Sequence, residues 1–378
     1  MQFEDELPSL LIAPRCKNPQ IKGAKVSDLK INRLLDAASN RASEAVRVVE
    51  DIVRFIFDDH ILTEHWKVFR HNLNAVLQTF PVEMRLAFRQ SDTDVGSSIT
   101  LSSETRRTNV ADLLAANIAR LQQSLRSLEE AAKLIDITAA QKIEGLRYRS
   151  YKLAEASQAL EASIQRLQDV KVCVLIGGDG PVDQEPQMID TLLSAEVGAI
   201  QLRVKGIDDT ELVTRARMLV EKTRGSKTLA IINDRPDIAV LSGADGVHVG
   251  QDDLSAKDAR QIVGPHRLVG VSTHNYEQLD EAVLDGANYV GIGPVFESRT
   301  KQFASFGGIS LLKQVANQTA IPVFAIGGIN LENIDDVIEA GVTRVAVASA
   351  ITAATDPGCV IATLHQRLDR TTSQAGSS

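Results

Sequence analysis

Residues 229–253 read LAIINDRPDIAVLSGADGVHVGQDD and contain two short apolar runs, each followed by polar side chains. Leu229–Asn233 and Gly246–Val249 are nearly continuous in aliphatic residues, which is typical of strands buried on both faces of a parallel sheet. Asn233-Asp234-Arg235 ends the first run, and Gly250-Gln251-Asp252-Asp253 follows the second. The segment therefore predicts two parallel strands that carry carboxylates to the same edge.

The same alternation of apolar runs and amphipathic segments continues over residues 170–378. The further strands that it predicts are Lys171–Ile176, Ala199–Lys205, Leu268–Ser272, Tyr289–Gly293, Val323–Ile326 and Arg344–Ala348. Amphipathic segments lie between them, for example at Asp208–Lys222, Tyr276–Asp285 and Leu331–Ala340. Eight such units in roughly 200 residues have the size of a (β/α)8 TIM barrel. The structural alternative, a doubly wound sheet, usually has about five or six strands.

The first half of the chain, before about residue 168, has few glycines and long stretches with helical periodicity. The predicted helices are Asp36–Phe57, Glu64–Leu77, Asn109–Leu134 and Ala139–Leu167, with Ser27 or Asp28 capping a shorter segment through Leu34 and a loop at Asp92–Ser103. We therefore expect an α/β protein, a TIM barrel with an N-terminal all-helical domain. The helical domain spans residues 1–168, the barrel 169–370, and a disordered polar tail 371–378.

The charge distribution separates the same two parts and excludes polyanionic partners. The 378 residues include 41 basic and 49 acidic side chains, a net charge of −8. Residues 1–169 contain 23 of each sign, so the remaining 26 acidic and 18 basic residues put the whole −8 on the barrel. An acidic chain with 4% aromatic residues argues against nucleic acid and anionic membranes as partners.

Cysteine spacing and hydropathy favour the cytoplasm. Cys16, Cys173 and Cys359 are far apart, so they form neither a disulfide framework nor a metal-ligand cluster. No apolar stretch reaches the ~18 residues of a membrane span, and the N-terminus is acidic where a signal peptide is basic. We expect a cytoplasmic protein that handles small molecules.

The helical half contains a weak repeat of charged residues. Arg41, Glu44, Arg47 and Glu50-Asp51 recur 79 residues later as Arg120, Gln123, Arg126 and Glu129-Glu130. At three-residue spacing these side chains share one helix face. They predict either solvated or mutually paired surface stripes, or an arginine-lined anion site between two helices.

The ends of the predicted strands carry the chemistry, because a TIM barrel places its active site there. Gln201, Arg203 and Lys205 alternate to one side, and the two cations indicate an anion site. Asp234 and Asp253 reach the same rim from neighbouring strands. Two carboxylates beside cations fit Mg²⁺ that keeps several waters and also binds substrate phosphates.

A second anion site is predicted on the other side of the rim. Gly327-Gly328 follows the seventh strand and Ala348-Ser349 the eighth, an arrangement that leaves backbone N–H groups exposed as in TIM-barrel phosphate sites. Two anion sites on one rim suit two phosphorylated substrates. His248 and His274 have no partners with metal-ligand spacing, and we interpret both as structural. No Ser-His-Asp set is present, which favours electrostatic and metal-assisted catalysis.

Several motifs in this order resemble the thiamine-phosphate synthase family. They are Gln-Leu-Arg-Val-Lys (201–205), Ile-Asn-Asp-Arg (232–235), Ala-Asp-Gly-Val-His-Val-Gly-Gln-Asp-Asp-Leu (244–254), Gly-Val-Ser-Thr-His (270–274), Gly-Ile-Gly-Pro-Val-Phe (291–296), Thr-Lys (300–301) and Ala-Ile-Gly-Gly-Ile (325–329). They cover the whole barrel. The family is a transferase of thiamine biosynthesis, which joins a hydroxymethylpyrimidine diphosphate to a thiazole phosphate and releases pyrophosphate.

The resemblance implies a role for each matching position. The contacts to the pyrimidine diphosphate are Gln201, Arg203, Lys205, Asn233, Ser272 and Lys301, of which Arg203, Lys205 and Lys301 are catalytic because they stabilise the departing pyrophosphate. The Mg²⁺ ligands are Asp234 and Asp253. The contacts to the thiazole phosphate are Ser298, Thr300, Gly328, Ala348 and Ser349. Where the family commonly has Thr-x-Thr-Lys, this chain has Ser298-Arg299-Thr300-Lys301, and serine keeps the hydroxyl.

Two alternatives concern the barrel. One is a related protein without synthase activity, such as a thiazole tautomerase, which the complete set of pyrophosphate-binding residues argues against. The other is a non-catalytic sensor of phosphorylated ligands. Release of pyrophosphate when the two substrates are mixed with Mg²⁺ distinguishes a synthase from both alternatives.

The helical half resembles an N-terminal extension of some bacterial thiamine-phosphate synthases, itself similar to a proposed family of hydroxymethylpyrimidine-phosphate kinases. The matching segments are Leu35–Arg41, Arg47–Asp51 and Asp94-Val-Gly96. No Walker-type glycine-rich loop is present, so the residues alone do not support a nucleotide site. The domain is then either a kinase that supplies the diphosphate or an interaction and dimerisation domain, and a homo-oligomer remains open.

Overall fold

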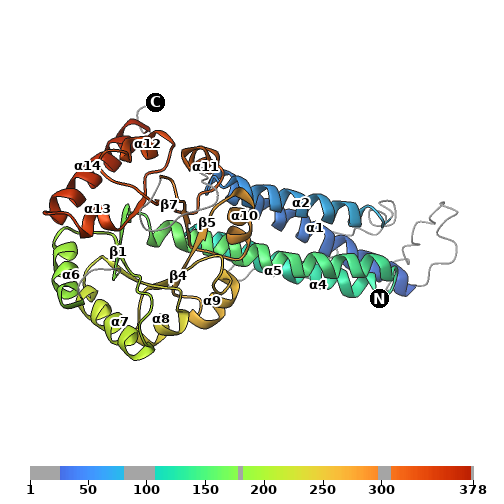
Figure 1. Ribbon diagram of the computed structural model, residues 1–378. Helices are drawn as coiled ribbons and strands as arrows, with labels where there is room; N and C mark the ends of the chain where they lie inside the picture. Colours follow the sequence, from blue (N-terminus) through green and yellow to red (C-terminus); the bar gives the residue numbers. More distant parts are fainter. Residues whose placement is uncertain (1–25, 81–106, 178–181, 297–307, 376–378) are drawn as a thin grey trace, which may run out of the picture.

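The computed structural model describes residues 26–80, 107–177, 182–296 and 308–375. These residues form an N-terminal helical bundle that extends from one side of a closed barrel (Figure 1). Among the described residues, no helix is long and apolar enough to cross a membrane.

In the described part of the N-terminal half, the bundle consists of four helices, each antiparallel to its neighbours: α1 (Val26–Phe55), α2 (His60–Leu77), α4 (Val110–Ala132) and α5 (Ile137–Arg166). Side-chain oxygens cap three of them, because Asp59, Asn109 and Asp136 accept hydrogen bonds from backbone N–H groups of the first turn. Ser27 and Asp28, expected as caps, instead lie inside α1, which continues without a break into the predicted Asp36–Phe57 helix. The predicted loop at Asp92–Ser103 lies outside the described residues.

The barrel has the predicted topology, a closed ring of parallel strands in chain order. The strands are β1 (Val172–Ile176), β2 (Ala199–Leu202), β3 (Leu229–Asn233), β4 (Gly246–Val249), β5 (Leu268–Thr273), β6 (Tyr289–Ile292), β7 (Val323–Ile326) and β8 (Val345–Val347). The expected strand Ala199–Lys205 was too long, since β2 ends at Leu202 and the two cations follow it. The prediction that Arg203 and Lys205 alternate along a strand is therefore wrong, although both residues lie just after the C-terminal end of β2.

Helices surround the strands (Figure 1). They are α6 (Glu185–Ser194), preceded by the 3-10 turn η4 (Val182–Gln184), then α7 (Asp209–Thr223), α8 (Pro236–Ser242), α9 (Ala256–Val263), α10 (Tyr276–Leu284), α11 (Gly308–Val315), α12 (Ile334–Glu339), α13 (Ser349–Thr352) and α14 (Pro357–Ala375). The tail expected to be disordered from Thr371 is helical through Ala375.

The bundle contacts the N-terminal ends of the strands. Asp59 accepts hydrogen bonds from Thr319 Oγ1 (2.6 Å) and the Ala320 backbone N–H (2.9 Å), just before β7. Asn288, just before β6, donates to Ser163 Oγ at 3.0 Å. Leu167, which follows α5, packs with the apolar side chains inside this end of the barrel. The C-terminal ends of the strands therefore face away from these contacts.

Among the described residues, Glu50 and Glu129 of the repeat pair with arginines of other helices and not with the arginines of the facing repeat helix. Glu50 of α1 instead pairs with Arg70 of α2 at 2.5 Å, and Glu129 of α4 with Arg147 of α5 at 2.7 Å. Arg126 pairs along its own helix with Glu129 (3.1 Å). These acidic residues of the repeat thus stabilise contacts within and between helices, as in the paired alternative.

Candidate active site at the C-terminal rim

Three neighbouring strands bring the predicted cations and carboxylates together. Arg203 and Lys205 follow β2, Asp234 follows β3 and Asp253 follows β4. The strands are adjacent and parallel, so the loops after them lie side by side. The Lys205 Nζ lies 3.9 Å from Asp234 Oδ2, the outer limit of an ion pair.

Asp234 is held in an unusual backbone conformation at the centre of this group. Its φ is +63°, in the left-handed region that few residues other than glycine adopt, and its N–H donates to the His248 carbonyl at 2.7 Å. Burial and, after it, the neighbouring Asp253 raise the pKa of Asp234 to about 6, although Lys205 and Arg203 oppose the shift. The two carboxylates are therefore close enough to repel when both are ionised.

This carboxylate pair fits a hard divalent cation such as Mg²⁺. Asp253 Oδ2 already accepts from the Gly250 backbone N–H at 2.8 Å, which turns its carboxylate towards the β4 loop. No group of three or more His, Cys, Asp or Glu suited to a metal occurs within the described ranges. Mg²⁺ commonly uses one or two protein carboxylates together with waters and substrate phosphates, so two ligands suffice.

Ser272 and Gln201 lie below the rim, on the inner side of the barrel. Ser272 Oγ is 2.9 Å from His248 Nε2, and its backbone carbonyl accepts from the Gln251 side chain at 2.6 Å. Gln201 is buried. Asn233 ends β3 in register with His248 of β4, so it too reaches this inner layer.

Glycines follow β7 as predicted. Gly327 and Gly328 both have positive φ values, +103° and +69°, so a Cβ at either position would be strained. The Gly328 carbonyl accepts from Asn333 Nδ2 at 2.9 Å, which holds the turn. Ala348 and Ser349 follow the adjacent β8 and are exposed, consistent with a surface open to a ligand.

The remaining predicted residues lie outside the described part. Ser298, Thr300 and Lys301 belong to the segment 297–307, about which the structure says nothing. His274 is held structurally, its Nδ1 lying 2.5 Å from the Gly293 carbonyl.

Sequence reasoning missed Gln251 and Tyr289, which support Ser272 and His248 from neighbouring elements. Tyr289 OH lies 3.3 Å from His248 Nδ1. The sequence feature that could have indicated the position of Tyr289 is Gly270 in β5, because a glycine without a side chain leaves space for the Tyr289 ring.

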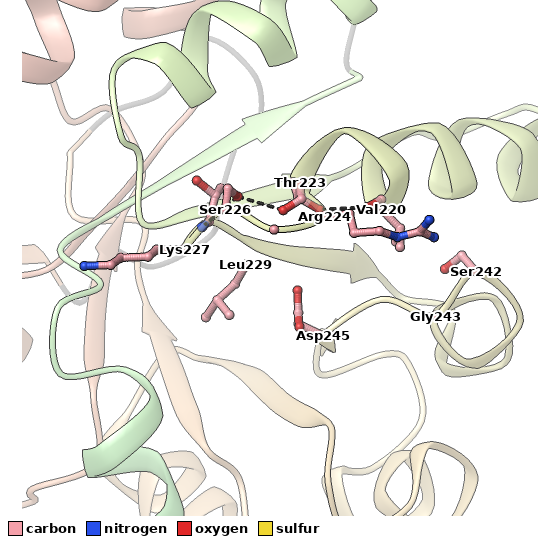
Figure 2. Close-up of a pocket in the computed structure, with 11 residues that line it drawn as sticks. Val220, Thr223, Arg224, Ser226, Lys227, Leu229, Ser242, Gly243 and Asp245 are labelled. Carbon is pink, nitrogen blue, oxygen red and sulfur yellow. Dashed lines mark hydrogen bonds between the residues drawn. The ribbon is translucent and has the colours of Figure 1, made fainter.

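A hollow of about 570 Å³ opens beside this rim. It is lined by Asp234, Asp253, the loop residues next to them, and residues of α8 and α9 such as Pro236 and Ile262. Figure 2 shows another hollow, of about 370 Å³, lined by Ser226, Leu229 and Asp245. It lies at the N-terminal ends of β3 and β4, the face that serves stability in TIM barrels. The candidate site is therefore the C-terminal rim, where Asp234 and Asp253 line the first hollow.

The closed barrel, with cations, paired carboxylates and a glycine turn at its C-terminal rim, defines a TIM-barrel enzyme for phosphorylated substrates. The chain matches the family model of thiamine monophosphate synthase over residues 173–351 and that of the ThiD2 family over residues 33–156. It belongs to the thiamine-phosphate synthase family, transferases of thiamine biosynthesis.

Two curated relatives establish this membership along most of the chain. The thiamine-phosphate synthase of Rhodopirellula baltica is 39% identical over 328 residues, which are 84% of this chain and 88% of the relative. That of Thermosynechococcus vestitus is 38% identical over 343 residues, 90% of this chain and 96% of the relative. A solved thiamine phosphate pyrophosphorylase from Pyrococcus furiosus is 31% identical, with a TM-score of 0.49 over 55% of this chain and 98% of that chain.

Proposed function

We propose that the barrel rim joins 4-amino-2-methyl-5-(diphosphooxymethyl)pyrimidine to 4-methyl-5-(2-phosphooxyethyl)thiazole, giving thiamine phosphate and pyrophosphate. The bond between the pyrimidine methylene carbon and its diphosphate oxygen breaks, and the electron pair leaves with pyrophosphate. The thiazole nitrogen supplies the pair for the new carbon–nitrogen bond. The reaction takes place in the cytoplasm, as the composition predicts.

The observation that carries this proposal is the Asp234–Asp253 pair beside two cations. Burial first, and then the nearby Asp253, raise the pKa of Asp234, and a bound cation would stabilise the ionised form against both effects. Asp234 and Asp253 would hold Mg²⁺, which supplies charge stabilisation to the departing pyrophosphate when bound. Arg203 and Lys205 bind the same diphosphate from the loop that follows β2.

The other rim residues position the two substrates against each other. Gln201, Asn233 and Ser272 contact the pyrimidine diphosphate, and Gly328, Ala348 and Ser349 bind the thiazole phosphate. Lys301, Ser298 and Thr300 complete the two sets as the family resemblance implies. Catalysis then consists of leaving-group stabilisation and proximity.

Pyrophosphate release tests the proposal with purified full-length protein, both substrates and Mg²⁺. We expect Asp234→Ala to lose at least about 100-fold in turnover, because an essential electrostatic partner of the leaving group is removed. Asp252→Ala is the matched control, since Asp252 is an exposed carboxylate in the same loop as Asp253.

Wild-type turnover and Mg²⁺ dependence in Asp234→Ala would contradict the metal assignment. Thiazole isomerisation without pyrophosphate release would favour the tautomerase, and ligand binding without turnover would favour the sensor.

For the bundle, the match to the ThiD2 family over residues 33–156 favours a second candidate function, phosphorylation of the pyrimidine monophosphate. The test is ATP-dependent diphosphate formation by full-length Asp234→Ala, in which the barrel no longer consumes the product. Failure to form diphosphate would favour the interaction and dimerisation domain instead.

A further inference from the structure

One arginine beside the carboxylate pair joins the loop after β3 to two helices. Arg235 follows Asp234 directly and precedes α8. Its Nε and Nη2 donate to the two carboxylate oxygens of Asp237, in the first turn of α8, at 3.0 and 2.7 Å. Its Nη1 donates to Asp209, the first residue of α7, at 2.5 Å. Each nitrogen of the guanidinium group therefore already has a carboxylate partner.

The backbone around Asp234 forms a three-residue turn. The Arg235 N–H donates to the Asn233 carbonyl at 2.9 Å, and the Asp234 N–H donates to the His248 carbonyl of β4 at 2.7 Å. Asp234 lies at the centre of this turn with a φ of +63°. Three-residue turns with a positive φ at the central residue are rare and strained. Such a turn persists only where its surroundings hold it in place.

The side chain of Arg235 holds the turn on the side that faces α7 and α8. The backbone hydrogen bond to β4 restrains the opposite side. Because α7 follows the loop that carries Arg203 and Lys205, the contact with Asp209 also links these cations to the turn. The Lys205 Nζ lies 3.9 Å from Asp234 Oδ2, so a small movement of the turn would change the spacing of charges at the rim.

We propose that Arg235 is a positioning residue, whose ion pairs with Asp209 and Asp237 hold the Asp234 carboxylate in place for a divalent cation. The inference rests on the proposed function for the assignment of Asp234 as a metal ligand. Both partners of Arg235 are exposed, so the ion pairs add little to the free energy of unfolding. Their effect is on the geometry of one strained residue.

The sign of the effect on cation affinity separates this role from simple electrostatics. Arg235→Gln removes a positive charge close to the cation site, so by charge alone the variant should bind a divalent cation more tightly. If Arg235 holds the turn, the free variant relaxes, and the cation must restore the strained turn when it binds. We then expect binding about tenfold weaker, because the cost of one left-handed residue is of that order.

Binding of Mn²⁺ to the full-length protein, without substrates, measures this affinity. Carboxylates also suit Mn²⁺, and the electron paramagnetic resonance signal of the free ion reports how much is bound. The relevant site is the one that Asp234→Ala removes. Lys222→Gln is the matched control and should bind as wild type does. It breaks an ion pair with Asp190 of α6 (2.6 Å) in the last turn of α7, far from the rim.

Arg235→Lys tests the two-pronged geometry of the guanidinium group. Lysine keeps the positive charge but presents a single nitrogen, so it cannot reproduce all three hydrogen bonds. We expect Mn²⁺ binding by Arg235→Lys to lie between those of wild type and Arg235→Gln. Unchanged or tighter Mn²⁺ binding in Arg235→Gln would overturn the proposal, and so would the absence of any wild-type site that Asp234→Ala removes.

Turnover supplies a second arm. In Arg235→Gln the Mg²⁺ concentration for half-maximal pyrophosphate release should rise about tenfold, while turnover at saturating Mg²⁺ stays within about threefold of wild type. A loss of turnover that excess Mg²⁺ does not restore would overturn the positioning role, because Arg235 would then act on the reaction itself. Weaker Mn²⁺ binding in Arg235→Gln, in a protein whose wild type releases no pyrophosphate, would support this inference and count against the proposed function.

Discussion

Replacement of Asp59 should loosen the bundle from the barrel, because this buried carboxylate bonds to both. Asp59 Oδ1 accepts from the Leu62 N–H at 2.7 Å and caps α2. Asp59 Oδ2 accepts from Thr319 Oγ1 and the Ala320 N–H of the barrel. Asp59→Ala removes all three interactions at a side chain that is 1% exposed.

The expected loss follows from these three bonds. Loss of the cap costs about 1 kcal/mol. Each of the two barrel donors loses a net hydrogen bond worth about 1 kcal/mol. Burial also removes water from the Asp59 carboxylate and raises its pKa. The alanine variant does not bear this cost of desolvation. We therefore use the net values and expect Asp59→Ala to lower the free energy of unfolding by about 3 kcal/mol.

Asp59→Asn divides this loss into its two parts. Asparagine caps a helix about as well as aspartate, but here it would present an NH₂ group to the two barrel donors. We expect a loss of about 2 kcal/mol, attributable to the barrel contacts. Asp51→Ala, at an exposed carboxylate of α1, is the matched control and should stay within about 0.5 kcal/mol of wild type.

Urea unfolding followed by tryptophan fluorescence measures these changes. The chain contains one tryptophan, and Trp66 is buried in α2 with its indole N–H bonded to Ser157 of α5 at 3.0 Å. With a slope of about 2 kcal/mol per molar urea, Asp59→Ala should lower the midpoint by about 1.5 M. A midpoint equal to that of Asp51→Ala would refute the assignment of Asp59 as the link between bundle and barrel.

Two further outcomes are expected from buried positions of the barrel. Gly270→Ala places a methyl group 2.1 Å from a ring atom of Tyr289, so thermal unfolding should show a loss of about 1–3 kcal/mol, and an unchanged midpoint would contradict the packing. Burial raises the pKa of the Cys173 thiol to about 12. At pH 8, iodoacetamide should therefore label the exposed Cys359 and leave Cys173 unmodified until the protein is denatured. Labelling of Cys173 in the native protein, measured by mass spectrometry of peptides, would contradict its burial.

Strands that are buried on both faces were predicted most accurately from sequence. Leu229–Asn233 and Gly246–Val249 have the predicted boundaries, because apolar composition and burial coincide there. The second strand was predicted three residues too long, since alternating polar residues after Leu202 look like a continuing strand. The N-terminus of α1 was misplaced because cap residues such as Ser27 also occur inside helices.

Strand order was sufficient to predict which charged residues share the rim, because consecutive strands of a barrel are neighbours. It did not predict the contacts of His248 with Ser272 and Tyr289 below the rim. The contact of His248 with Tyr289 depends on cross-strand register and on the space beside Gly270, which no local pattern reports. Contacts such as that of Asp59 with Thr319 join residues 260 positions apart, so local periodicity cannot predict them either.

The placement of the bundle also bears on any diphosphate that it makes. The bundle contacts residues before β6 and β7, whereas the rim follows β2–β4 at the opposite end. The described interior between them is packed with side chains such as Phe324 and Tyr289. A diphosphate formed at the bundle must therefore reach the rim from outside its own barrel. The test supplies labelled pyrimidine monophosphate and ATP together with excess unlabelled diphosphate. If the diphosphate passes through solvent, the unlabelled diphosphate should dilute the label in thiamine phosphate in full proportion. More label in thiamine phosphate than this proportion would refute passage through solvent.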